Sequence, residues 1–258
     1  MITETQARQQ NLSGCDVFKQ THLCYKDDLN RDAFVVRLNF EAYKIFLSSI
    51  LIGQFPTLKD EQQKRKAEFE SGFINSAISP IEFYRMEYIN LENFYIATGF
   101  ELHFKSNLLQ NDFVVNIFDN KGVFKSLFDK QKDCPVHKDE LFNISGYYYD
   151  PSKQINILNG ITENSLNFGK LCTSPSYGSA LNLSSDILGL AEDFRNLRNQ
   201  IHLPGDAKDA PFLNSVGDRL IPTLVKYINE NIVENTNQLI AKHKLNYSNL
   251  LQRLNYFD

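Results

Sequence analysis

The amino-acid sequence predicts an all-α protein, a helical bundle with an N-terminal helical extension and an irregular insertion in its middle. Two observations carry this prediction. Apolar residues recur at spacings of three and four over several long stretches, and one long stretch that lacks this period separates them. A chain of 258 residues is long enough for one large or two small domains. We expect residues 1–78 to form the extension and residues 79–258 the main helical domain.

About six helices, most of them long, are expected in five helical stretches outside the insertion, from their periodicity and from the residues that can begin and end them. They span residues 32–53, 57–78, 80–109, about 185–203 and 211–254. The third is the longest and has the clearest start, because Ser79 can cap it and Pro80 suits the first helical position. The last should bend or break near Pro222.

The insertion covers about residues 111–180. Its sequence is rich in Gly, Asn, Ser and Tyr and has no sustained helical period, although a small hairpin is expected around residues 147–158. Long irregular segments inside compact domains are often functional.

Composition and charge favour a cytoplasmic protein without a membrane segment. No secretory signal precedes the first helix, and the longest nearly apolar run is far shorter than the roughly 20 residues that cross a bilayer. The net charge of −4 argues against coating nucleic acid by bulk attraction, so any such contact must be local. The four cysteines show no pairing pattern and are expected to be free thiols.

The segment 193–205, DFRNLRNQIHLPG, holds the strongest candidate site. On a helix, Arg195, Arg198, Asn199 and His202 share one arc beside the apolar stripe that faces the core. Arginine can hold phosphate oxygens with two parallel hydrogen bonds, and histidine can transfer a proton near neutral pH. Such a set suits metal-independent cleavage of RNA. A plain helix end is the competing interpretation, because basic residues near a C-terminus also suit the helix dipole.

The same segment resembles the signature of the HEPN superfamily, helical-bundle domains whose motif is Arg, then four to six residues of which the first is usually polar, and then His. Arg195 and Asn196 followed by His202 match this pattern, while Arg198 lies one residue too close to His202. We favour Arg195 as the motif arginine and leave the choice open. On the long helix, Glu101 and Lys105 resemble a Glu-x-x-x-Lys element of some HEPN branches, although an exposed ion pair would have the same spacing.

The resemblance implies a metal-independent endoribonuclease in prokaryotic defence, such as abortive infection, or in toxin–antitoxin growth control. It implies catalytic roles for Arg195, His202, Asn196 and Arg198, with Asn199, Glu101 and Lys105 in support. RNA, a second copy of the chain, and an antitoxin or defence-complex protein are the implied partners. The alternative is a non-catalytic HEPN-like module that binds RNA, a nucleotide or a protein, and a third possibility is a toxin silenced by residues 1–78.

No cofactor or metal is expected. Cys134 and His137 have the spacing of half a zinc site, but no second half is recognisable, and His22 with Cys24 is too isolated to complete it. His103 and His243 are lone histidines in helical segments and are interpreted as packing or surface residues.

Overall fold

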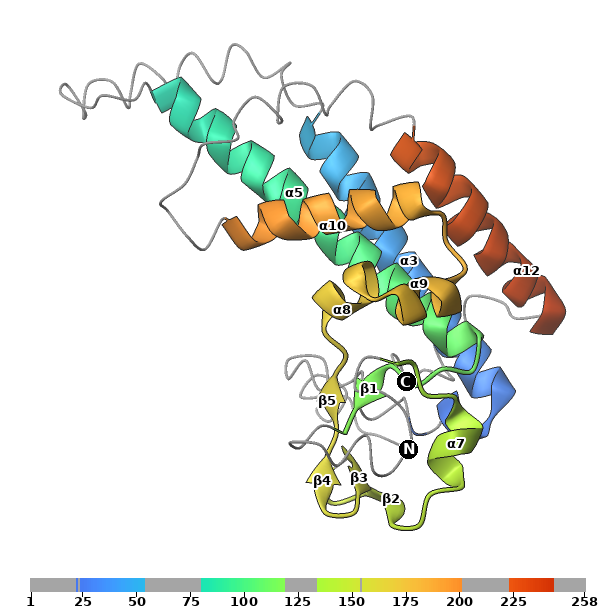
Figure 1. Ribbon diagram of the computed structural model, residues 1–258. Helices are drawn as coiled ribbons and strands as arrows, with labels where there is room; N and C mark the ends of the chain where they lie inside the picture. Colours follow the sequence, from blue (N-terminus) through green and yellow to red (C-terminus); the bar gives the residue numbers. More distant parts are fainter. Residues whose placement is uncertain are drawn as a thin grey trace.

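The computed structural model describes residues 22, 24–53, 80–118, 134–153, 155–200 and 223–243. These residues are mostly helical and also form small antiparallel sheets (Figure 1). The predicted all-α class is therefore confirmed only in its helical part. The longer elements are α3 (Asp28–Gly53), α5 (Pro80–Gln110), α10 (Ser185–Gln200), the π-helix η3 (Ile228–Val233) and α12 (Glu234–His243).

Helices α3 and α5 pack along one another and form the centre of the fold (Figure 1). They can approach closely because residue 99 is glycine: a Cβ atom there would lie 2.8 Å from the ring of Phe46. That ring is fully buried and meets the ring of Phe100 edge-on, with 5.2 Å between the centroids. The α3 helix, which lies within the predicted extension, thus shares one hydrophobic core with α5.

Two further helices pack against this pair (Figure 1). Helix α10 crosses α5, and the buried ring of Phe194 stacks on Phe100 at 6.5 Å. Helix α12 lies beside α3, where the Asn39 amide donates to the Thr236 hydroxyl at 3.1 Å. The predictions of a long helix from Pro80 and of a helix from Ser185 are confirmed.

The insertion is more regular than its sequence indicates. Strands β2 (Tyr147–Asp150) and β3 (Ile155–Leu158) form the predicted hairpin, with Tyr147 opposite Leu158. Strand β4 (Ile161–Thr162) extends this sheet, and β1 (Asn116–Ile117) pairs with β5 (Asn164–Ser165). Three short helices complete it: α7 (Lys138–Phe142), α8 (Phe168–Thr173) and α9 (Pro175–Leu181). The irregular insertion that the sequence predicts thus contains short regular elements within residues 111–118, 134–153 and 155–180.

A buried carboxylate joins the two small sheets. Glu163 accepts hydrogen bonds from the Asn116 amide of β1 at 2.5 Å and from the backbone N–H of Asn156 in β3 at 2.7 Å. The Asn156 amide also donates to both carboxylate oxygens at 2.9 Å. Burial raises the pKa of Glu163, and these donors oppose the rise. This residue holds the insertion together rather than facing solvent.

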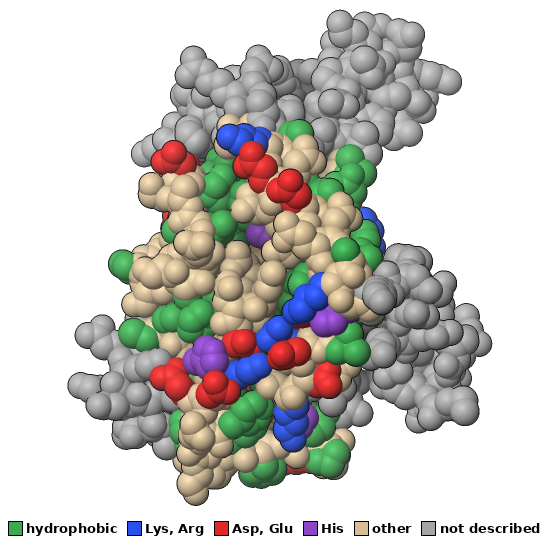
Figure 2. Space-filling model, turned by 90° about the vertical axis from the view of Figure 1, so that its right-hand side faces the viewer, with side chains coloured by type: hydrophobic (Ala, Val, Ile, Leu, Met, Phe, Trp, Pro, Cys, Tyr) green, Lys and Arg blue, Asp and Glu red, His purple; other side chains and the backbone are tan. Residues whose placement is uncertain are grey.

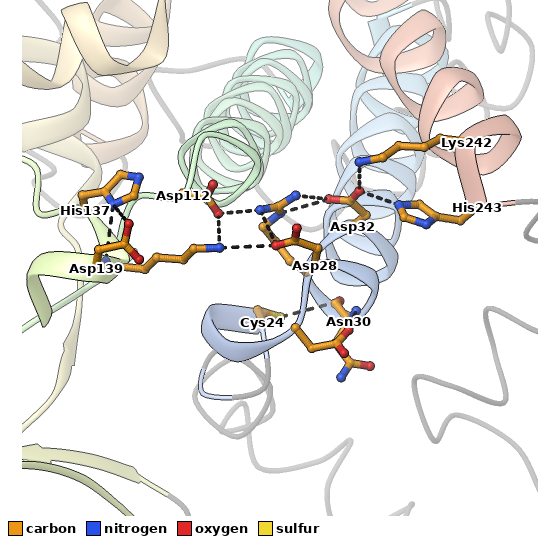
Figure 3. Close-up of polar contacts among 12 residues, drawn as sticks. Cys24, Asp28, Asn30, Asp32, Asp112, His137, Asp139, Lys242 and His243 are labelled. Atoms are coloured by element: carbon orange, nitrogen blue, oxygen red, sulfur yellow. Dashed lines mark hydrogen bonds and ion pairs between the residues drawn. The ribbon is translucent and has the colours of Figure 1, made fainter. Parts of the chain in front are cut away.

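A network of charged side chains fastens the ends of the helices together (Figure 3). At its centre is Asp32 of α3, whose side chain is 1% exposed. Its carboxylate accepts hydrogen bonds from Arg31 at 3.0 Å and from Lys242 at 2.9 Å. It also lies 2.6 Å from Nε2 of His243. Arg31 and Lys138 also contact Asp112, which follows α5 in the left-handed backbone region at φ 63°. On the surface, basic and acidic side chains lie side by side (Figure 2).

None of the helices in the described ranges is both long enough and apolar enough to cross a membrane. The predicted helix at 57–78, the bend at Pro222 and the start of the last helix lie outside the described residues. So does the proposed boundary at residue 78.

Candidate functional site

Helix α10 places the two arginines at the edge of the core. Ala191 and Phe194 are buried against α5, whereas Arg195 and Arg198 are half-buried on the adjacent arc, as the helical wheel predicts. The side chains of Asn196 and Asn199 are exposed. The arginine heads thus lie where an apolar wall meets solvent, a position in which charge–charge contacts are stronger than in open water.

Arg195 is held by a carboxylate from its own helix. Its Nε and Nη2 atoms donate to the two carboxylate oxygens of Glu192 at 2.6 and 2.5 Å. Nη2 also donates to the Asn196 side-chain oxygen at 2.9 Å. The hydrogen bonds to Glu192 are the largest cause of a raised pKa at Arg195, which stays charged at any physiological pH. One edge of this guanidinium is therefore occupied.

Arg198 meets the long helix α5 at the predicted Glu-x-x-x-Lys element. Its Nη1 atom donates to Glu101 Oε2 at 3.0 Å, across 97 residues of sequence. Lys105 donates to the other oxygen, Oε1, at 2.8 Å. The structure thus brings together Arg198, Glu101 and Lys105, which the sequence analysis had taken from two separate motifs.

Helix α8 and the strand before it supply the opposite side of the site. Lys105 also donates to the hydroxyl of Ser165 at 2.9 Å, and the Arg198 guanidinium lies 5.5 Å from the centroid of the Phe168 ring. A Cβ atom on Gly169 would lie 3.4 Å from Arg195 Nη1, so glycine leaves room beside that atom. The insertion is therefore a part of the candidate site.

The charges of the site act on one another. Burial would raise the pKa of Glu101, but Lys105 and Arg198 outweigh it and hold that pKa below its ordinary value. The half-buried Cys172 of α8 has its pKa raised to about 12 by burial and by Glu192 and Glu101, against the opposing effect of both arginines. Its thiol is thus uncharged at neutral pH and is a poor nucleophile. Three cations and two carboxylates give the site one net positive charge.

The remaining predicted residues do not join this cluster within the described ranges. His202 lies outside the described residues, so its position relative to Arg195 and Arg198 stays a prediction. Asn199 is exposed and makes no polar contact with another described residue. In the same part of the chain, no three His, Cys, Asp or Glu side chains are grouped as they would be around a metal ion.

The histidines and cysteines considered for zinc have other contacts. His137 caps α7, accepting from the Asp139 backbone N–H at 3.3 Å, and Cys134 lies 3.8 Å from the Ser176 hydroxyl. The ring of His22 stacks on Tyr149 with 4.4 Å between the centroids. Of the four cysteines, Cys24, Cys134 and Cys172 are free, as expected, and Cys15 lies outside the described residues.

His103 is a packing residue, as predicted, and is fully buried in the core. Its Nδ1 atom lies 2.5 Å from the Tyr227 hydroxyl, at the start of the π-helix η3. Burial lowers the pKa of His103 to about 4, so the ring is neutral. His243 packs against Asp32 in the charged network.

Five residues of the site were not predicted from the sequence: Glu192, Ser165, Phe168, Gly169 and Cys172. One of them carried a signal, since Glu192 lies three residues before Arg195 on a predicted helix, where opposite charges pair. The other four come from the insertion, and only tertiary packing brings them to α10.

Comparisons with protein-family models, curated proteins and solved structures gave no match. The HEPN resemblance therefore rests on the motif residues alone.

Proposed function

We propose that this protein is a metal-independent endoribonuclease of the HEPN type. The observation that carries the proposal is the convergence of Arg198, from the segment 193–205, on Glu101 and Lys105 of the Glu-x-x-x-Lys element. If the two short matches to the HEPN signature were due to chance, their residues would not be expected to contact one another. Here they form a single charged cluster with a net positive charge beside an aromatic ring, which suits a phosphodiester.

The residues can be given roles in a known type of RNA cleavage. The 2′-oxygen attacks the adjacent phosphorus, the bond from phosphorus to the 5′-oxygen breaks, and a 2′,3′-cyclic phosphate and a 5′-hydroxyl are formed. A proton leaves the 2′-hydroxyl and another reaches the leaving oxygen. In the proposal, His202 transfers a proton, and the arginines stabilise the negative charge on the phosphate oxygens.

One copy of the chain offers one histidine from the motif, whereas the reaction moves two protons. We therefore propose a homodimer in which the α10 helices face one another and the two motifs form one cleft. The proposed setting is prokaryotic defence or growth control in the cytoplasm, with an antitoxin or another defence protein as a restraining partner.

Cleavage of RNA in the presence of a chelator tests the proposal. Purified protein should cut a labelled single-stranded RNA in excess EDTA and leave 2′,3′-cyclic phosphate ends, which mass spectrometry identifies. If EDTA abolishes cleavage and Mg²⁺ restores it, the chemistry belongs to a bound metal and the proposed roles of these residues are wrong.

One observation favours a non-catalytic binding module as a second candidate. Glu192 already occupies the Nε and Nη2 atoms of Arg195, the arginine that the motif spacing favours. Expression in a bacterial host separates the two functions. An enzyme should arrest growth unless a partner restrains it, and His202→Ala should relieve the arrest, whereas a binding module should not arrest growth at all.

A further inference from the structure

The two arginines of α10 differ in which side of the guanidinium is occupied. In Arg195 the edge formed by Nε and Nη2 is filled by Glu192, and Nη2 bonds Asn196 as well. In Arg198 the contact with Glu101 uses Nη1. Among the described residues, neither Nε nor Nη2 of Arg198 has a hydrogen-bond partner, although the side chain is only 22% exposed.

This difference matters because an arginine binds a phosphate best through two parallel N–H donors on one edge. A phosphate could reach that edge of Arg195 only by displacing a carboxylate bound at 2.5 and 2.6 Å. Among the described residues, nothing occupies the same edge of Arg198.

The surroundings of Arg198 also fix the direction of its free edge. Phe168 supports the guanidinium from one side at 5.5 Å, and Glu101 holds Nη1. Phe168 is itself buried and packs edge-on against Phe104 of α5, with 6.0 Å between the centroids. Glu101 is anchored by Lys105. A donor pair held in place in this way loses little conformational entropy when it binds an anion.

We infer that Arg198 is the residue that contacts the substrate phosphate, through its Nε and Nη2 atoms, and that Phe168 and Glu101 are positioning residues for it. Arg195 is then held in a structural pair by Glu192 at the edge of the site. This inference rests on the proposed function, since it names the group that holds the RNA phosphate. It also resolves the choice between the two arginines against the sequence-based preference for Arg195.

Side-chain NMR tests the inference without RNA cleavage. The Nε–Hε signals of uniformly ¹⁵N-labelled protein are assigned with the single variants Arg195→Lys and Arg198→Lys, and inorganic phosphate is added at constant ionic strength, with chloride as the control anion. The Arg198 signal should shift in a saturable manner with phosphate and not with chloride, and the Arg195 signal should not.

The outcomes separate this inference from the ribonuclease proposal. A phosphate-dependent shift at Arg198 in a protein that cleaves no RNA leaves the inference standing and contradicts the proposed function. A saturable shift at Arg195, or at neither arginine, overturns the inference, whether or not RNA is cleaved.

Discussion

At the scale of single residues, Glu101 links the two helices of the candidate site, α5 and α10. One carboxylate oxygen contacts Arg198 of α10 and the other contacts Lys105 of its own helix. Lys105 and Arg198 hold its pKa below the ordinary value, so it is ionised at neutral pH. Both charged motifs are recognisable in the sequence, but which arginine Glu101 contacts depends on how α10 crosses α5.

RNA binding should depend on the geometry of Arg198 more than on its charge. We expect Arg198→Lys to weaken the binding of a 2′-O-methyl RNA, which cannot be cleaved, by roughly tenfold, because lysine keeps the charge and loses the planar pair of donors. Arg195→Lys is the matched control and should change the dissociation constant less than about threefold. Fluorescence anisotropy at fixed salt measures both. Equal effects of the two substitutions would contradict separate roles.

The stability of the fold should depend strongly on Asp32. Asp32→Asn leaves Arg31, Lys242 and His243 around a neutral, buried amide, and loss of one partner from a buried ionic network costs roughly 3–5 kcal/mol. The control is Asp28→Asn, since Asp28 contacts Arg31 and Lys138 but its side chain is 69% exposed. Its loss should cost at most about 1 kcal/mol. Urea denaturation provides the comparison, and equal losses would show that Asp32 is not central.

The same network predicts the direction of the acid dependence. Burial would raise the pKa values of Asp32 and Asp112, but their basic partners outweigh it and the net values are lowered. A lowered pKa in the folded state gives stability that is complete above the unfolded value, about 3.9, and is lost as the pH falls below it. The unfolding free energy should therefore fall on acidification below about pH 4, and less steeply in Asp32→Asn. Identical slopes would contradict this account.

At the scale of elements, long helices were predictable and short ones were not. The period of apolar residues and the signals at Ser79 and Pro80 are properties of local sequence, and they placed α5 correctly. The hairpin of β2 and β3 was also predicted. Helices α7, α8 and α9 are each too short to be stable alone. Side-chain caps begin α7 and α8, Pro175 begins α9, and tertiary contacts help to hold all three. No periodicity could show that α8 would lie against the arginines.

The close packing of α3 on α5 should make Gly99 sensitive to substitution. Gly99→Ala places a methyl group 2.8 Å from the ring of Phe46, which is fully buried and cannot move without disturbing Phe100. Overpacking should outweigh the gain in helix propensity and lower the unfolding free energy by roughly 1–2 kcal/mol.

A glycine in α10 provides the matched control. A Cβ atom on Gly189 would have no neighbour within 4 Å, so Gly189→Ala should raise the unfolding free energy by roughly 0.5–1 kcal/mol. Thermal unfolding followed by circular dichroism gives both values. A stabilised Gly99→Ala variant would show that the two helices have room to separate.

At the scale of the whole molecule, the proposed homodimer follows from the number of proton-transfer groups that each copy supplies. Light scattering should give twice the mass of a 29.8 kDa chain at the concentrations at which RNA is cleaved. A protein that cleaves RNA while it is monomeric at every usable concentration would show that a single chain is sufficient.

The central claim is that the motif performs chemistry on RNA, and His202 tests it most directly. We compare the rate of RNA cleavage in excess EDTA by the parent protein and by His202→Ala at matched folding, judged from thermal unfolding. Loss of a proton-transfer group should lower the rate by roughly 10²- to 10⁴-fold and leave the affinity for 2′-O-methyl RNA nearly unchanged. A well-folded His202→Ala variant that cleaves as fast as the parent would contradict the claim.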